Sequence, residues 1–178
     1  MKRILALALT GTLLVAGHAR AGNIGLGGFG GWSIPIVQED QSQGSVYGLR
    51  APLSFTPLLT VEPFWSSSAL GDQTVNIGGV DFTRSGSDVT TFGANVLLST
   101  GGPMRFYPYA GIGAVKFERT GQDESYTSYH FGLGVGFTPA PKVSLDVRGE
   151  LQAAVKDQVS RKMANITVGA SYALFGLN

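Results

Sequence analysis

Residues 22–32, GNIGLGGFGGW, are the first stretch whose residue types and spacing could do chemistry. Its segment 25–30 has the G-x-G-x-x-G spacing that lets a loop approach the phosphates of a dinucleotide. That use requires a strand before the glycines and a helix after them. Here a leader-like segment precedes them, and Pro35 interrupts any helical continuation. Every second residue of 24–36 is apolar or glycine, which indicates a strand and no nucleotide site.

Ser128, His130 and Glu150 have the residue types of a hydrolase. A serine nucleophile needs a base within hydrogen-bonding reach, and the base needs a group that orients it. Ser128 and His130 lie two residues apart, and alternation places both on the polar strand face that also carries Glu150. The alternating segments described below predict a β-barrel, and this polar face would line its interior, where a lipid substrate has no access. No catalytic residue is therefore expected.

Acidic residues that could hold a metal ion fall in predicted loops. They are Glu39, Asp40, Asp123 and Glu124. Their spacing matches no calcium-binding loop, and a chain without cysteine has no thiolate ligand and no disulfide. We expect neither a metal nor a cofactor.

Residues 1–21 are predicted to be a secretory signal peptide. Lys2 and Arg3 precede an apolar run, and Ala19-Arg20-Ala21 fits the small-x-small pattern before a cleavage site. The apolar run is shorter than the roughly 20 residues of a membrane-spanning helix. Because three of the 13 basic residues lie in this leader, the remaining chain (22–178) carries 10 basic residues against 12 acidic ones. A nucleic-acid partner is not expected from that balance.

Alternation of apolar and polar residues recurs in eight segments of the chain after the leader. They are 24–36, 46–55, 58–66, 89–99, 105–117, 127–137, 143–155 and 163–175. In the fifth segment the pattern is less clean, and we expect a bulge that shifts its phase near Val115. No segment has a convincing helical period.

The connections between these segments alternate in length. Turn-like connections at 56–57, 100–103 and 138–141 alternate with polar ones at 38–44, 67–88, 118–125 and 156–161. Short turns at one rim and longer loops at the other are typical of outer-membrane barrels. The sequence therefore predicts an all-β fold, an eight-stranded antiparallel up-and-down transmembrane β-barrel. Within 67–88, residues 74–77 and 80–83 are predicted to form a small hairpin.

Charge and aromatic placement indicate that the apolar faces meet lipid. The polar faces carry few charged or ionisable residues, opposite in sign, and we expect them to form a lumen network: Arg50, Glu62, His130, Asp146, Arg148 and Glu150. A water-facing surface is normally about a quarter to a third charged, and buried charges require partners. Aromatic residues gather toward two rims, Trp32, Tyr47, Trp65 and Tyr129 at the long-loop rim and Phe55, Phe106, Phe137 and Tyr172 at the short-turn rim. Two such girdles are what the two lipid interfaces favour.

The chain resembles the small outer-membrane β-barrel family typified by the membrane domain of outer membrane protein A. The resemblance covers essentially all of 22–178, and the stretches that carry it are IGLGGFGGW, RFYPYAGIGA, YHFGLGVGF and NITVGASYALF. It implies an outer-membrane location, contact with outer-membrane lipids and insertion by the barrel assembly machinery. The chain departs from the family by ending Phe-Gly-Leu-Asn where a terminal aromatic is usual, so Tyr172 and Leu174 are expected to serve instead. No peptidoglycan-binding domain follows the barrel, so cell-wall tethering is not implied.

An eight-stranded barrel has an interior that side chains can fill. We therefore expect a non-enzymatic protein with a closed polar core, which acts through surface interactions of loops 67–88 and 118–125. A narrow ion-conducting channel is the principal alternative. A barrel-type lipid-modifying enzyme similar to lipid A deacylase and a soluble lipocalin-like carrier are weaker ones.

Overall fold

The structure, a computed structural model, describes residues 22–36, 42–100, 102–119, 122–156 and 159–176. The predicted signal peptide, part of loop 38–44 and the last two residues lie outside these ranges. The elements are β1 (Asn23–Ile36), β2 (Ser42–Arg50), β3 (Leu53–Ser54), β4 (Leu59–Gly71), β5 (Gln73–Ile77), β6 (Val80–Arg84), β7 (Asp88–Leu98), β8 (Met104–Arg119), β9 (Gln122–Ala140), β10 (Val143–Lys156) and β11 (Val159–Gly176). The described residues contain no helix long and apolar enough to cross a membrane.

The strands form a closed barrel. Each strand pairs antiparallel with its neighbours in the order β11-β10-β9-β8-β7-β4-β2-β1, and β1 pairs again with β11. β3 pairs with β1 and β4, as β2 does, so it continues the position of β2 in the wall. Closure matters in lipid because an open sheet edge would leave backbone groups without hydrogen bonds. The predicted eight-stranded antiparallel barrel is confirmed.

Pro52 explains why the second predicted strand divides into β2 and β3. Proline has no N–H to donate to a neighbouring strand. The wall stays bonded across the break, because the Pro52 carbonyl accepts from Gly25 N at 2.9 Å and Ala51 N donates to the Pro63 carbonyl at 2.9 Å. The interruption is therefore local.

The bulge predicted near Val115 is wrong. β8 pairs with β7 and with β9 in unbroken register through this region. Val115 and Phe117 stay in phase with Tyr107 and Tyr109, and all four side chains point inward. The pattern was misleading because this end of the barrel interior is apolar, so inward residues there resemble lipid-facing ones.

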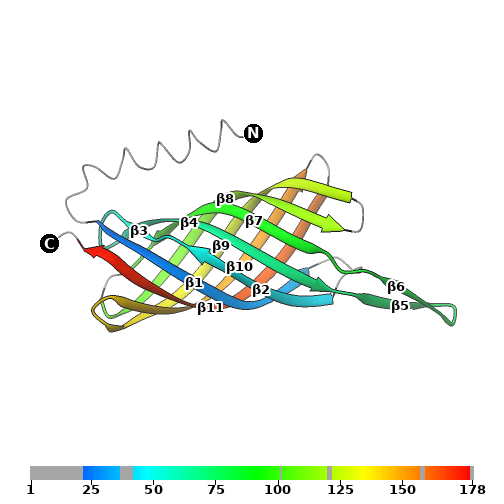
Figure 1. Ribbon diagram of the computed structural model, residues 1–178, viewed down its shortest axis with the longest axis horizontal. Helices are drawn as coiled ribbons and strands as arrows, with labels where there is room; N and C mark the ends of the chain where they lie inside the picture. Colours follow the sequence, from blue (N-terminus) through cyan, green and yellow to red (C-terminus); the bar gives the residue numbers. More distant parts are fainter. Residues whose placement is uncertain (1–21, 37–41, 101, 120–121, 157–158, 177–178) are drawn as a thin grey trace.

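The wall extends further at the long-loop rim than alternation predicted. β8 and β9 continue to Arg119 and Gln122, so most of the predicted loop 118–125 is paired strand. The predicted hairpin within 67–88 is confirmed as β5 and β6, joined by Gly78 and Gly79, both at positive φ. Figure 1 shows this hairpin projecting past the barrel, at the end opposite to the start of β1 and the end of β11.

The polarity of the wall is that of a membrane barrel. Leu145, Val147 and Leu151, on β10, lie on the outer surface, and Leu133 of β9 is 69% exposed. The alternate residues Asp146 and Arg148 are buried in the interior. A water-soluble barrel would have the reverse arrangement, and a continuous apolar exterior of this kind calls for lipid contact.

Candidate functional site in the barrel interior

The centre of the interior holds an ion cluster formed by Arg50, Glu62, Asp146 and Arg148. Arg50 donates to Asp146 from Nη1 at 3.0 Å and from Nη2 at 2.5 Å. Arg148 donates to Glu62 from Nη1 at 2.5 Å and from Nη2 at 2.9 Å, and its Nε donates to Asp146 Oδ1 at 3.1 Å. Arg50 Nε lies 3.9 Å from Glu62 Oε2. The four formal charges cancel, and each carboxylate lies within ion-pair distance of both arginines.

Three strands position this cluster, and aromatic rings enclose it. Arg50 ends β2, Glu62 is near the start of β4, and both Asp146 and Arg148 project from β10. The Arg148 guanidinium carbon lies 5.3 Å and 5.5 Å from the ring centroids of Tyr107 and Tyr109. Arg148 Nε also donates to the Tyr107 hydroxyl at 3.0 Å. Buried charges cost several kcal/mol each unless paired, so the cluster depends on all its members.

A second polar cluster joins Ser128, His130, Glu150, Tyr109 and Asn165. The Ser128 hydroxyl lies 3.0 Å from His130 Nε2, and His130 Nδ1 lies 3.2 Å from Glu150 Oε1. Tyr109 and Asn165 both donate to Glu150, at 3.3 Å and 3.1 Å. All six residues expected in the lumen lie inside the barrel. Arg50, Glu62, Asp146 and Arg148 form the first cluster, and His130 and Glu150 belong to the second.

The Ser128–His130–Glu150 chain has the connectivity of a hydrolase triad, but its environment differs. Ser128 is 0% exposed and faces the lumen from the middle of β9. A nucleophile needs a substrate within reach, and here the neighbours of the serine are protein side chains. The arrangement can orient a histidine ring and satisfy a buried carboxylate without catalysis.

Above these clusters, toward the long-loop rim, the lumen is filled by an apolar layer. Its members are Leu70, Val89, Val115, Phe117, Tyr126, Ala154 and Met163, all buried. Phe117 and Tyr126 pack edge to face, with ring centroids 5.3 Å apart. This layer was not predicted, because apolar residues on strands were assigned to the lipid-facing side. The signal in the sequence was that Val115 and Phe117 are an even number of residues from Tyr107 and so share its face.

The outer mouth of the lumen carries charged groups stacked on this layer. Arg161 lies 4.7 Å from the Phe117 ring centroid and 3.4 Å from Glu124 Oε2. The hydroxyl of Tyr126 donates to Glu124 at 2.7 Å, and this hydrogen bond, aided by Arg161, holds the pKa of Glu124 below its usual value. Hydrogen bonds to Asp123 and Glu118 raise the pKa of Lys116 nearby.

Two tyrosines fill the space that strand glycines leave in the wall. Gly132 and Gly134 pair with Tyr109 and Tyr107, and side chains at either glycine would meet the facing ring. Glycine at these positions is what lets two large rings lie inside a narrow barrel. The tyrosines were visible in the sequence as inward residues of the fifth strand, but their role against the glycines required the register.

The aromatic residues of the predicted girdles lie on the outer face of the wall, except Phe55, which lies in the turn after β3. Six are exposed: Trp32, Tyr47, Phe106, Tyr129, Phe137 and Tyr172. Trp65 and Phe55 are less exposed, and Tyr47 packs edge-on against Trp65 with centroids 6.1 Å apart. Among the described residues, no group of three or more His, Asp or Glu side chains is arranged to hold a metal ion.

Comparison with known proteins identifies the family of this barrel. The sequence matches the family described as outer membrane protein beta-barrel domain over residues 4–173. The chain belongs to this family. Its location is the outer membrane, as predicted. No curated protein sequence matches it significantly.

Several solved outer-membrane proteins are similar in fold. Neisserial surface protein A (NspA) has a TM-score of 0.62 at 12% identity, over 86% of this chain and 97% of that one. A major outer membrane protein of Thermus thermophilus has a TM-score of 0.55 at 12% identity, over 85% and 99%. Ail, the attachment invasion locus protein of Yersinia pestis, in complex with the heparin analogue sucrose octasulfate, has a TM-score of 0.50 at 20% identity, over 85% and 97%. At these identities the likeness concerns the fold.

Proposed function

We propose that this outer-membrane barrel is closed to solute flow and acts at the cell surface, as a rigid scaffold for its extracellular hairpins. The observation that carries the proposal is the filling of the lumen by two layers in series. An ion-paired layer crosses the centre, and an apolar layer lies between it and the outer mouth. A cavity beside the ion-paired layer, lined by Phe29, Asn95 and Arg148 among others, has a volume of about 30 Å³, roughly the share of one water molecule.

The β5–β6 hairpin is the principal display element. Its Thr74–Thr83 hydroxyls are 3.0 Å apart, and Asn76 Nδ2 donates to Asp81 Oδ1 at 2.6 Å, so one face is polar and internally bonded. Val80 and Phe82, which belong to the alternate pairs of the hairpin, are more than half exposed. Exposed apolar side chains on a projecting element favour contact with a partner molecule. The names of NspA and Ail, a surface protein and an attachment protein, agree with such a role.

The hairpin's base allows a clean deletion. Leu70 N donates to the Ser87 carbonyl at 3.0 Å, and Gly86 N donates to Asp72 Oδ1 at 2.7 Å, so the two strands are already joined below the hairpin. Removing residues 73–84 should leave heat-modifiable gel migration unchanged and abolish attachment of expressing cells to host-cell or matrix surfaces. A matched double variant, Val80→Ser with Phe82→Ser, keeps the hairpin and tests the apolar contact alone. Undiminished attachment after the deletion would remove the hairpin from the proposal.

Conductance separates the closed scaffold from a narrow ion path. Purified protein in planar bilayers should show no sustained openings. The channel alternative gains support if discrete, long-lived openings occur and change with the Arg148→Met substitution.

Insertion by the barrel assembly machinery is part of the same proposal. The last described strand, β11, presents Tyr172, Leu174 and Phe175 on or near the outer surface, where a recognition factor can reach them.

A further inference from the structure

A second, larger cavity opens at the rim where the short turns lie. Its volume is about 200 Å³, and it is lined by residues from β1, β3, β4, β7, β8, β9, β10 and β11, by Pro52 and by the turn before β10. It lies on the opposite side of the ion cluster from the apolar layer, since Glu62, Asp146 and Arg148 also line it. Short turns face the periplasm in outer-membrane barrels, so a ligand would enter from the periplasmic side and stop at the cluster.

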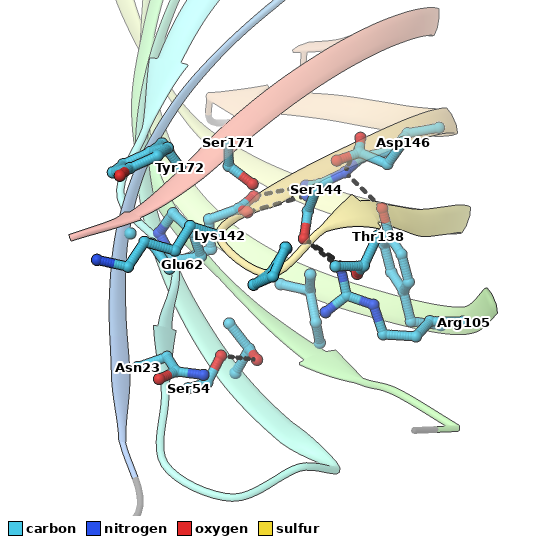
Figure 2. A pocket seen from close by; sticks show the side chains of 18 residues that line it. Asn23, Ser54, Glu62, Arg105, Thr138, Lys142, Ser144, Asp146, Ser171 and Tyr172 are labelled. Atoms are coloured by element: carbon cyan, nitrogen blue, oxygen red, sulfur yellow. Dashed lines mark hydrogen bonds and ion pairs between the residues drawn. The ribbon is translucent and has the colours of Figure 1, made fainter. Parts of the chain in front are cut away.

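Two cations on its walls have no carboxylate partner. Arg105 Nη2 donates to Ser144 Oγ at 2.9 Å, and its Nε is buried without a hydrogen-bond partner among the described residues. Lys142 Nζ lies 6.0 Å from the ring centroid of Tyr172. Within the described part of the chain, neither cation is at ion-pair distance from an acidic side chain. Figure 2 shows Arg105 beside Ser144 and Thr138, and Lys142 near Tyr172.

The floor of the cavity does not repel an anion. Glu62 and Asp146 are its acidic residues, and both are already neutralised by the two central arginines. The positive charge of Arg105 is thus uncompensated in a partly enclosed space, where Coulomb attraction is stronger than in water, and Lys142 adds a second uncompensated charge at the exposed rim.

Hydroxyl groups supply further donors. Ser54 Oγ and Thr60 Oγ1 are 2.9 Å apart, and Thr138 Oγ1 and Ser144 Oγ are 3.5 Å apart. Each pair uses only one of its two hydroxyl hydrogens, so one hydrogen of each pair remains to donate.

From this geometry we propose that the periplasmic cavity binds a small oxyanion. Arg105 is the main ligand, because a guanidinium edge offers parallel N–H donors to carboxylate or phosphate oxygens. Lys142 adds a point charge at the rim, and the hydroxyl pairs complete the coordination. A space of about 200 Å³ corresponds to roughly six or seven water volumes, enough for acetate or inorganic phosphate.

The test uses the whole protein refolded in detergent micelles, labelled with ¹⁵N-arginine. Acetate and, separately, inorganic phosphate are titrated at constant pH and ionic strength while the Arg105 Nε–H resonance is followed. The site predicts a saturable shift with at least one of the two probes. Ethylammonium, a cation of similar size, should cause no saturable shift.

Three variants assign the binding to this cavity. The affinity of the Arg105→Gln protein for the anion is measured by calorimetry. It should fall at least about tenfold, because a charge-assisted hydrogen bond is lost. Lys142 lies at an exposed turn, so Lys142→Gln should leave folding intact. It should also weaken anion binding. Lys162→Gln, with the same charge change at the opposite end of the barrel, should bind as the wild type does. The proposal is overturned by shifts that stay linear with both probes, by undiminished binding in the Lys142→Gln protein, or by equal weakening in all three.

Discussion

At the scale of single residues, Arg148 is the group on which the central cluster most depends. It holds Glu62 with two hydrogen bonds, reaches Asp146 and Tyr107 through Nε, and lies against two tyrosine rings. Replacing it with methionine leaves Glu62 buried without its principal partner. Breaking a buried pair on one side costs about 3–5 kcal/mol.

We therefore expect Arg148→Met to lower the free energy of unfolding by that amount, measured by urea unfolding in lipid vesicles. The double variant Glu62→Gln, Arg148→Met should recover part of the loss, since it removes the stranded charge. Lys116→Met, which breaks the exposed ion pairs of Lys116 with Glu118 and Asp123 at the outer rim, is the control and should leave the transition midpoint unchanged. Equal effects from Arg148→Met and Lys116→Met would contradict the role of the cluster.

A glycine facing a tyrosine gives the second prediction at this scale. A methyl group at Gly134 would meet the ring of Tyr107, whose hydroxyl is held by Arg148, so the ring cannot move away freely. Gly134→Ala should destabilise the barrel by about 1–3 kcal/mol, as overpacking does. The control is Gly149→Ala, where an added methyl meets nothing within 4 Å. Its unfolding free energy should stay within about 0.5 kcal/mol of wild type.

Glu124 gives a prediction about pH. Its pKa is lowered in the folded protein by the Tyr126 hydrogen bond and by Arg161. The stabilising contribution is thus complete above the usual glutamate pKa and is lost as pH falls through the lower folded value. Tyr126→Phe should raise the Glu124 pKa toward its usual value, observed as a shifted midpoint in a carboxyl-carbon NMR titration. Tyr129→Phe, on the outer face, should leave that midpoint where it is.

At the scale of elements, the seam between the first and last strands closes the barrel. β1 and β11 pair along fourteen positions, from Asn23–Gly176 to Ile36–Lys162. At Gly31 an added Cβ would lie against the Ile166 carbonyl and 2.8 Å from the Cα of Thr167. Backbone atoms cannot turn aside as a side chain can, so the seam requires glycine here.

Gly31→Ala should therefore slow or prevent barrel closure. The expected result is a smaller heat-modifiable, folded fraction on gels after refolding. Gly30→Ala is the matched control, because its Cβ would have only an ordinary 3.7 Å contact with the Val46 carbonyl. If both variants fold equally well, the seam tolerates more separation than the structure indicates.

At the scale of the whole molecule, enclosure decides what the Ser128–His130–Glu150 chain can do. The side-chain order of a triad is present, with the Ser128 hydroxyl 3.0 Å from His130 Nε2 and His130 Nδ1 3.2 Å from Glu150 Oε1, yet the serine lies inside a filled lumen. Folded protein should not be labelled by a fluorophosphonate probe, as read by intact mass. Labelling that disappears in Ser128→Ala would show that the lumen admits small molecules and would reopen the enzyme alternative.

Much of the fold could be predicted because the membrane imposes a strict period. A strand in a barrel wall turns alternate residues to lipid and lumen, so Leu145, Asp146, Val147 and Arg148 reveal their faces directly. The same rule identified the charged residues that share the interior. The alternation rule failed at Val115 and Phe117, because an apolar residue on the inner face has the same residue type as a lipid-facing one.

The amino-acid sequence by itself determined the eight strand segments of the wall, most of their inward and outward faces, and which rim carries the long connections, because these follow from residue type along one strand. Only the tertiary structure decided that Arg148 meets Glu62, eighty-six residues away, that Arg105 is left without an acid, and that an apolar layer closes the outer half of the lumen. These depend on register and closure, which set the heights at which residues of distant strands face one another. Alternation along a single strand contains no information about that height.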